Sequence, residues 1–348
     1  MNEYITMVPA ENLSFLTGIY RWGIEIIRVI QKMENPVLTG LIKGITALGT
    51  ENFYIPLIVI IFWWIDEKRG LRLGFLIIIS AWINAFMKDL WKQPRPFHLE
   101  PSLGLAMESS YGAPSGHAQM SLTFWIPMAA WLCEKPGRKR CAIWAAAVSF
   151  ILLMGFTRLY LGVHFPTDLL AGWILGGIIL VLWFFLRSRG EAILTQAGFR
   201  VQNITVAVLV LLMNSLHPLD RSLPALFLGF CIGYTLMKHR FPFEAKGEIN
   251  GKKPGYRIMA FRCLSGFLGL AILFIALRLI LPGEGSLFGS IPIWGAASPF
   301  YELGRFIRYS LIGFWVSAGA PRMFQHMGLA EIPHNPDTKE NSSGAELQ

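Results

Sequence analysis

Long apolar runs separated by short polar segments dominate the chain. Nine such runs are present, at residues 52–66, 71–89, 116–133, 140–157, 167–187, 201–217, 222–238, 258–281 and 298–320. Because the hydrocarbon core of a bilayer is spanned by about 20 helical residues, runs of this length are typical of transmembrane helices. The pattern predicts an all-α fold, a polytopic transmembrane helical bundle with about nine spans.

The first 50 residues do not fit this pattern. Segment 15–34 places Arg21, Glu25, Arg28 and Lys32 among apolar residues at helical spacing, which suits an interfacial helix better than a span. We therefore expect an N-terminal interfacial segment (1–50), a core of five spans (51–189) and a C-terminal extension of four spans (190–332). Residues 333–348, rich in Asn, Ser, Lys and Glu, predict a disordered cytoplasmic tail.

Composition supports the membrane assignment and excludes other classes. Hydrophobic residues make up 53% of the chain and charged residues only 15%, against about 25% in soluble domains. The net charge of +9 lies in short loops between apolar runs, as expected for lipid-headgroup contacts rather than for nucleic-acid binding. The four cysteines lack metal-ligand spacing, and the first residues lack the pattern of a cleaved signal peptide.

Basic residues are unequally divided between the two sides of the predicted bundle. Loops 66–72, 134–140, 187–200 and 238–257 carry sixteen lysines and arginines, whereas the opposite side carries five from Lys88 onward. The positive-inside rule places the basic loops in the cytoplasm. We therefore expect the other side to face the periplasm of a bacterial inner membrane, or a lumen in a eukaryote.

Three polar clusters lie where apolar runs end or begin, and counting spans places all three on this non-cytoplasmic side. They are Lys88 with Arg95-Pro96, then Pro114-Ser115-Gly116-His117, and finally Arg158 with His164 and Asp168.

The first two clusters have features of an anion site. Arg95 offers a bidentate fork to phosphate oxygens, and Lys88 offers a point charge. Ser115 can cap the following helix, whose free amide groups attract an anion, and Gly116 allows close backbone approach. His117 would then lie within reach of a phosphate ester. The alternative is a pair of interfacial anchors and an ordinary capped helix with an interfacial histidine.

The third cluster is the most informative. Asp168 follows His164 by four residues, so its carboxylate can accept a hydrogen bond from one imidazole nitrogen and leave the other free as a nucleophile. The alternative is a capping aspartate beside a histidine without a chemical role.

Together, Lys88-x6-Arg95-Pro96, Pro114-Ser115-Gly116-His117 and Thr157-Arg158-x5-His164-x3-Asp168 resemble the signature of the type 2 phosphatidic acid phosphatase superfamily. That superfamily includes lipid phosphate phosphatases, glucose-6-phosphatases and vanadium haloperoxidases. The resemblance covers about residues 50–187, with Thr157 where the family usually has Ser. It implies that His164 attacks phosphorus, Asp168 orients His164 and His117 transfers the proton. It also implies that phosphate is held, without metal or cofactor, by Lys88, Arg95, Ser115, Gly116 and Arg158.

The resemblance implies a phosphoric ester or acid anhydride hydrolase acting through a phosphohistidine. The expected substrate is a lipid phosphate or diphosphate: a prenyl diphosphate, phosphatidate, phosphatidylglycerol phosphate or sphingoid phosphate. Its partners would be that substrate and membrane lipids. A sugar phosphatase of the glucose-6-phosphatase type and a lipid phosphotransferase remain alternatives, as does a non-enzymatic transporter with an idle site.

Overall fold

The structure of the protein is a computed structural model. It describes residues 10–134, 139–282, 286–288, 290–291, 294–295 and 298–333, with side chains from residue 17 onward. Within these ranges the chain forms helices and no β-strand, which confirms the all-α class. The tail expected to be disordered lies, from residue 334 onward, outside the described residues.

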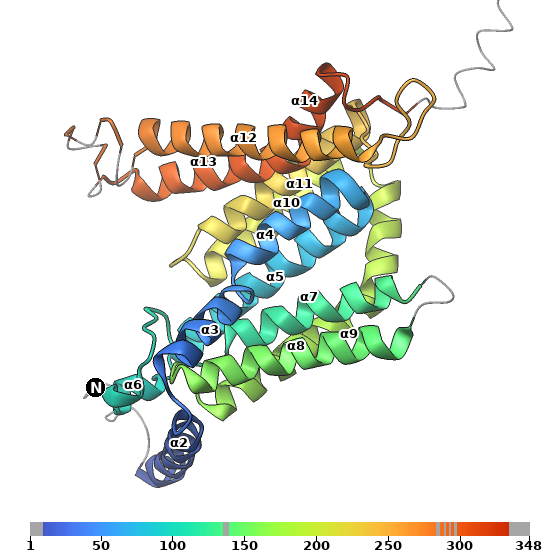
Figure 1. Cartoon of the computed structure of the whole chain (residues 1–348). Helices are drawn as coiled ribbons and strands as arrows, with labels where there is room; N and C mark the ends of the chain where they lie inside the picture. Colours follow the sequence, from blue (N-terminus) through green and yellow to red (C-terminus); the bar gives the residue numbers. More distant parts are fainter. Residues whose placement is uncertain are drawn as a thin grey trace, which may run out of the picture. The chain divides into compact units, whose positions relative to one another are not determined.

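Each predicted apolar run is helical in the structure (Figure 1). The runs correspond, in chain order, to α4 (Glu51–Ile60) with the π-helix η1 (Ile61–Ile65), α5 (Glu67–Trp91), α7 (Gly116–Leu132), α8 (Arg140–Tyr160), α9 (Pro166–Gln196), α10 (Phe199–Leu216), α11 (Ser222–Arg240), α12 (Tyr256–Ile280), and α13 (Tyr301–Phe314) with the π-helix η3 (Trp315–Gly319). The last run continues into α14 (Ala320–His326).

Five helical segments among the described residues are long and apolar enough to cross a membrane: Glu67–Leu99, Arg140–Tyr160, Pro166–Gln196, Phe199–Leu216 and Tyr256–Ile280. A sixth is possible if α3 (Pro36–Ala47) and α4 with η1 form one span bent by 44°. Only 11% of the most apolar stretch of α12 is buried inside the protein, so its apolar side chains face outward, as in contact with lipid. The protein is a multi-pass membrane protein, and the count of nine spans stays a prediction.

The N-terminal segment is helical, as the sequence predicted, and it packs against the ends of other helices. Helix α2 (Ala10–Gln31) contacts α6 (Pro96–Leu99) and α8, and lies across their ends in Figure 1. The Gln31 side-chain amide donates to the carbonyl oxygens of Leu103 (2.9 Å) and Tyr160 (2.8 Å). Ile27 is completely buried beside Leu103 and Phe165. These contacts hold α2 beside the loop that joins α8 to α9.

The chain folds as two compact units, residues 1–57 with 73–193 and residues 58–72 with 194–348. The two N-terminal helices are therefore part of the first unit, together with α7, α8 and α9. The division at residues 50 and 189 that we expect from the sequence stays a prediction.

Two glycines bring α9 close to α7 in the first unit. A Cβ atom on Gly172 would lie 2.6 Å from the Ser115 carbonyl oxygen, and one on Gly176 would lie 3.2 Å from the Gln119 carbonyl oxygen. No larger side chain fits at the first of these positions without a shift of the backbone. The close approach places the N-terminus of α7 beside the N-terminus of α9, where Asp168 lies.

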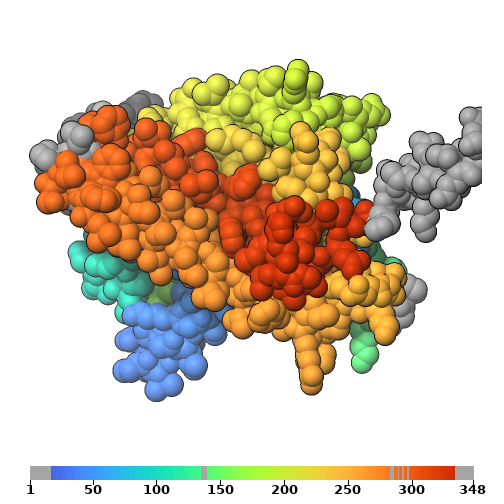
Figure 2. Space-filling view, turned by 90° about the horizontal axis from the view of Figure 1, so that it is seen from above, coloured from blue at the N-terminus to red at the C-terminus, as the bar shows by residue number. Residues whose placement is uncertain are grey.

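The second unit contains η1 and α10 to α14, and the space-filling view in Figure 2 shows α13 and α14 against α12. Arg262 of α12 is completely buried and donates to the carbonyl oxygens of Ala245 and Leu329, each at 2.7 Å. Its guanidinium also lies over the Phe243 ring at 5.5 Å. This buried cation therefore ties α12 to two non-helical segments of its own unit.

Candidate active site

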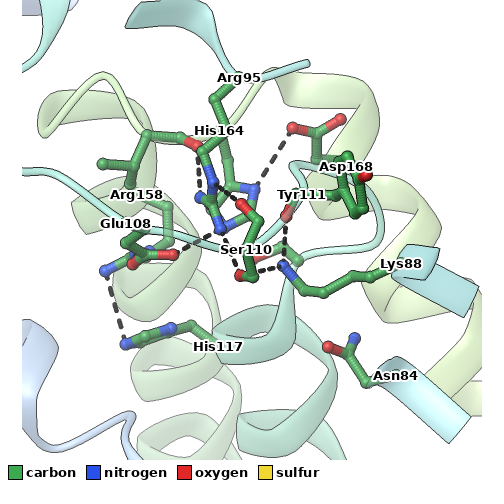
Figure 3. Close-up of polar contacts among 12 residues, drawn as sticks. Asn84, Lys88, Arg95, Glu108, Ser110, Tyr111, His117, Arg158, His164 and Asp168 are labelled. Atoms are coloured by element: carbon green, nitrogen blue, oxygen red, sulfur yellow. Dashed lines mark hydrogen bonds and ion pairs between the residues drawn. The ribbon is translucent and has the colours of Figure 1, made fainter. Parts of the chain in front are cut away.

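Five helix ends of the first unit carry the residues that the sequence predicts for the site, and the structure brings them together (Figure 3). Lys88 lies in the last turn of α5, Arg95 precedes α6, and His117 lies in the first turn of α7. Arg158 lies in the last turn of α8, His164 in the following loop and Asp168 in the first turn of α9.

His164 is buried and held from both sides of its imidazole ring. Its Nδ1 lies 3.3 Å from Asp168 Oδ2, which also accepts a hydrogen bond from the Phe165 backbone N–H at 2.9 Å. Its Nε2 lies 3.2 Å from Arg95 NH1. Burial, followed by the positive charges of Arg95 and Lys88, lowers the pKa of His164 well below its ordinary value. The ring is therefore neutral near pH 7, and Nε2 is the nitrogen on the side of the cations.

Arg95 is completely buried and fixed by carbonyl oxygens. Its NH1 donates to Val163 O at 2.8 Å, its Nε donates to Ser110 O at 2.6 Å, and its NH2 donates to Ser110 Oγ at 3.0 Å. Lys88 approaches the same loop, since its Nζ donates to Tyr111 O at 2.6 Å and to Ser110 Oγ at 3.3 Å. The loop thus holds both cations in a fixed position.

Arg158 forms the other half of the site, next to His117. Its NH1 lies 3.4 Å from His117 Nε2 and donates to Thr46 Oγ1 of α3 at 2.8 Å. Thr157, which replaces the usual family serine, donates to the Met154 carbonyl oxygen at 2.7 Å, and its Oγ1 lies 3.1 Å from Thr46 Oγ1. Thr157 thus contacts Arg158 indirectly, through a threonine that sequence reasoning missed. No sequence signal marks Thr46, because it lies in the segment expected to be interfacial.

Glu108 was also missed, although it contacts both Arg95 and Arg158 (Figure 3). Its Oε2 lies 2.7 Å from Arg95 NH2, and its Oε1 forms an ion pair with Arg158 NH2. Glu100 and Glu108 are the two carboxylates between Arg95 and His117, and nothing in the sequence distinguishes one from the other. Glu108 links the His164 half of the site to the His117 half.

Ser115 and Gly116 support the start of α7. Ser115 is buried, its Oγ accepts from the Ala118 backbone N–H at 3.5 Å, and its own N–H donates to Asp168 O at 2.9 Å. A Cβ atom on Gly116 would lie 3.2 Å from Asn84 Oδ1. The Nδ2 atom of Asn84 donates to Gln119 Oε1 at 2.8 Å. Direct phosphate binding by Ser115 and Gly116 stays a prediction.

In the part of the chain that the structure describes, no cluster of three or more His, Cys, Asp or Glu side chains is arranged to hold a metal ion. The residues labelled in Figure 3 include the three cations, two imidazoles and two carboxylates described above.

Fold and site together define a multi-pass, all-helical membrane protein in which three cations, two imidazoles and two carboxylates lie together at helix ends. The model of the PAP2 superfamily matches residues 69–191, and the model described as the transmembrane extension of PAP2 superfamily phosphatases matches residues 222–332. The chain belongs to the PAP2 superfamily, and it is a phosphoric ester hydrolase.

Three similar proteins illustrate the relationship. Phosphatidylglycerophosphatase B of Bacillus subtilis is 32% identical over 46% of this chain and 79% of its own length. Undecaprenyl-diphosphatase of Sulfolobus acidocaldarius is 27% identical over 55% of this chain and 87% of its own length. The crystal structure of a transmembrane PAP2-type phosphatidylglycerolphosphate phosphatase from Bacillus subtilis covers 51% of this chain and 88% of its own, with 28% identity and a TM-score of 0.43.

Proposed function

We propose that the protein hydrolyses a lipid phosphate or diphosphate through a phosphohistidine intermediate, with the site facing away from the cytoplasm. One observation carries the proposal. Glu108, an anion of the chain itself, is held by Arg95 and Arg158 together, and each arginine lies beside one of the two histidines. A phosphoryl group in the position of that carboxylate would have an imidazole on each side, as in-line displacement requires.

In the first step, His164 Nε2 attacks phosphorus and forms a P–N bond while the P–O bond to the leaving group breaks. Asp168 accepts a hydrogen bond from His164 Nδ1, which keeps the lone pair on Nε2 and stabilises the ring as it becomes positive. His117 donates a proton to the leaving oxygen. The leaving group is an alcohol for a monoester and a lipid monophosphate for a diphosphate.

In the second step, water attacks the phosphohistidine and His117 takes up its proton, so that the P–N bond breaks and inorganic phosphate leaves. Lys88, Arg95 and Arg158 neutralise the charge on the equatorial oxygens in both steps. Ser115 and the Gly116 amide complete this set, in the role that the family resemblance implies. Every step is balanced by groups of the chain and one water, without a metal or cofactor.

The lipid character of the substrate rests on the setting of the site and on the relatives. The site lies at the ends of helices whose outer surfaces are apolar, so a lipid headgroup can reach it while its chains stay in the bilayer. The two relatives named above act on lipid substrates according to their names. The positive-inside bias of the loops supports a periplasmic or luminal site.

A panel assay tests the proposal. The purified protein in detergent, with a chelator, is given phosphatidylglycerol phosphate, a prenyl diphosphate, phosphatidate, a sphingoid phosphate and glucose 6-phosphate, and phosphate release is measured. We expect vanadate-sensitive release from at least one lipid and none from the His164→Ala variant. Release from glucose 6-phosphate alone would favour the sugar phosphatase, and label transfer to a second lipid would favour the phosphotransferase. No release from any compound by a folded protein would favour the transporter with an idle site.

A further inference from the structure

The carboxylate of Glu108 lies where the proposed mechanism requires the phosphoryl group of the substrate to bind. Each of its two oxygens engages a different buried arginine, Arg95 through Oε2 and Arg158 through Oε1. The arginine side chains are 0% and 3% exposed, whereas the Glu108 side chain is 29% exposed. The carboxylate is therefore accessible to water although its partners are not.

The loop that carries Glu108 is fixed at its two ends. Leu105 N–H donates to the Leu161 carbonyl oxygen at 3.1 Å, and Gly112 N–H donates to the Gln93 carbonyl oxygen at 2.8 Å. Between these anchors Met107 is 74% exposed, and Ser109 is exposed as well. A rotation of the Glu108 side chain toward solvent would therefore leave the anchors and the helix ends in place.

Carboxylate and phosphate are recognised by guanidinium groups through the same forked hydrogen bonds. The guanidinium nitrogens that Glu108 occupies are the ones a phosphoryl group needs, and a dianion next to an unmoved carboxylate would be repelled. Binding of phosphate and binding of Glu108 to the two arginines therefore exclude each other.

We propose that Glu108 is a built-in competing anion: it occupies the phosphate pocket of the resting enzyme, and the substrate phosphate must displace it. The inference rests on the proposed function of the pocket. In the empty site Glu108 keeps two buried guanidinium groups paired. In the presence of substrate it lowers the apparent affinity, because only the fraction of molecules with a displaced Glu108 can bind.

The test measures phosphate binding without turnover. The full-length His164→Ala protein in detergent is titrated with inorganic phosphate and with orthovanadate by isothermal titration calorimetry, with and without Glu108→Gln. The amide keeps the shape of Glu108 and loses its charge. Since hydrogen bonds to charged groups are roughly twice as strong as neutral ones, we expect both ligands to bind about tenfold more tightly to the glutamine variant.

Glu100→Gln is the matched control. Glu100 lies in the same inter-helix segment and pairs with Arg28, whose side chain is 57% exposed, outside the anion pocket. Its replacement should leave phosphate affinity within about twofold, because an exposed ion pair contributes little. Glu108→Asp is the second variant for the pocket. Its shorter side chain should hold the two arginines less well and give an affinity between those of the parent and Glu108→Gln.

The inference would be overturned by a phosphate affinity that is unchanged or weaker in a folded Glu108→Gln protein, or by a Glu108→Asp protein that binds phosphate more weakly than the parent. Equal tightening by Glu100→Gln would also contradict it, because the effect would then come from net charge alone. The test is independent of lipid hydrolysis. A protein that hydrolyses no lipid but shows the expected affinity order would refute the proposed function and retain the competing anion.

Discussion

Asp168→Asn separates the charge of Asp168 from its geometry. In the structure a single oxygen, Oδ2, lies 3.3 Å from His164 Nδ1 and accepts the Phe165 backbone N–H at 2.9 Å. In the asparagine variant the Phe165 N–H selects the amide oxygen for this position, since the amide nitrogen cannot accept a hydrogen bond. His164 should therefore keep its orientation and tautomer, and lose only the negative charge that stabilises its positive form.

The size of the effect follows from this geometry. A hydrogen bond to a charged partner contributes about 1.5–3 kcal/mol and a neutral one about 0.5–1.5 kcal/mol. The difference, about 1–2 kcal/mol, corresponds to a decrease in kcat of roughly 5- to 30-fold. Asp168→Ala also removes the acceptor of the Phe165 N–H and frees the His164 ring. We expect its kcat to fall by at least a further factor of about ten, and its stability by about 1–3 kcal/mol.

The assay is initial-rate phosphate release from the best substrate of the panel, for both variants and the unaltered protein, with thermal unfolding in detergent as a check of the fold. The reasoning predicts the order of kcat as unaltered protein, then asparagine, then alanine. An asparagine variant with undiminished kcat would show that the charge of Asp168 has no role in the chemistry. Equal losses in both folded variants would show that orientation and charge are not separable here.

Three further predictions follow from other contacts. Thr46→Val should lower kcat/KM roughly tenfold, because it removes a hydrogen bond to Arg158. Thr205→Val is the control and should not lower it, because the Thr205 hydroxyl donates to Val201 O within α10. Equal kcat/KM values for the two variants would contradict a role for Thr46. Because the pKa of His164 is lowered, its imidazole should stay neutral as the pH falls from 7 to 6. After correction for ionisation of the substrate phosphate, whose pKa is about 6, kcat/KM should therefore not decrease over this range. A decrease with an ordinary histidine pKa that is still present in His117→Ala would refute this. Gly112→Ala should lower activity and the unfolding temperature, because its Cβ would lie 2.6 Å from Pro94 O; Gly177→Ala, with nothing within 4 Å, should lower neither.

The helices and the meeting of the three clusters were predictable because they depend on local sequence. Apolar runs of span length form helices whatever their neighbours, since backbone groups in a bilayer must be hydrogen-bonded internally. The number of spans between Lys88, His117 and His164 then assigns all three to one side of the membrane, without any knowledge of how the helices pack. The structure places them in one cluster (Figure 3).

Long-range contacts could not be predicted in this way. Thr46 reaches Arg158 across 112 residues, and nothing around it in the sequence differs from an interfacial helix. The hydrogen bond from Asn84 to Gln119 joins two apolar helices. In the sequence each of the two is a single polar residue within an apolar run, so nothing indicates that they form a pair. Glu108 lies in a loop without periodicity, so its position between two arginines depends on the folded chain. The sequence therefore predicts the residues proposed to act on phosphate. It does not predict the side chains that hold those residues in place, or the one proposed to compete with phosphate.

The most direct test of the central claim is to trap the phosphoenzyme. The protein is mixed with a ³²P-labelled substrate, quenched in alkali within the first turnover, and digested to locate the label by mass spectrometry. The account predicts an alkali-stable, acid-labile phosphate on His164, which forms more slowly in His117→Ala and is absent from His164→Ala. Label on another residue, or full turnover by the His164→Ala protein, would contradict it.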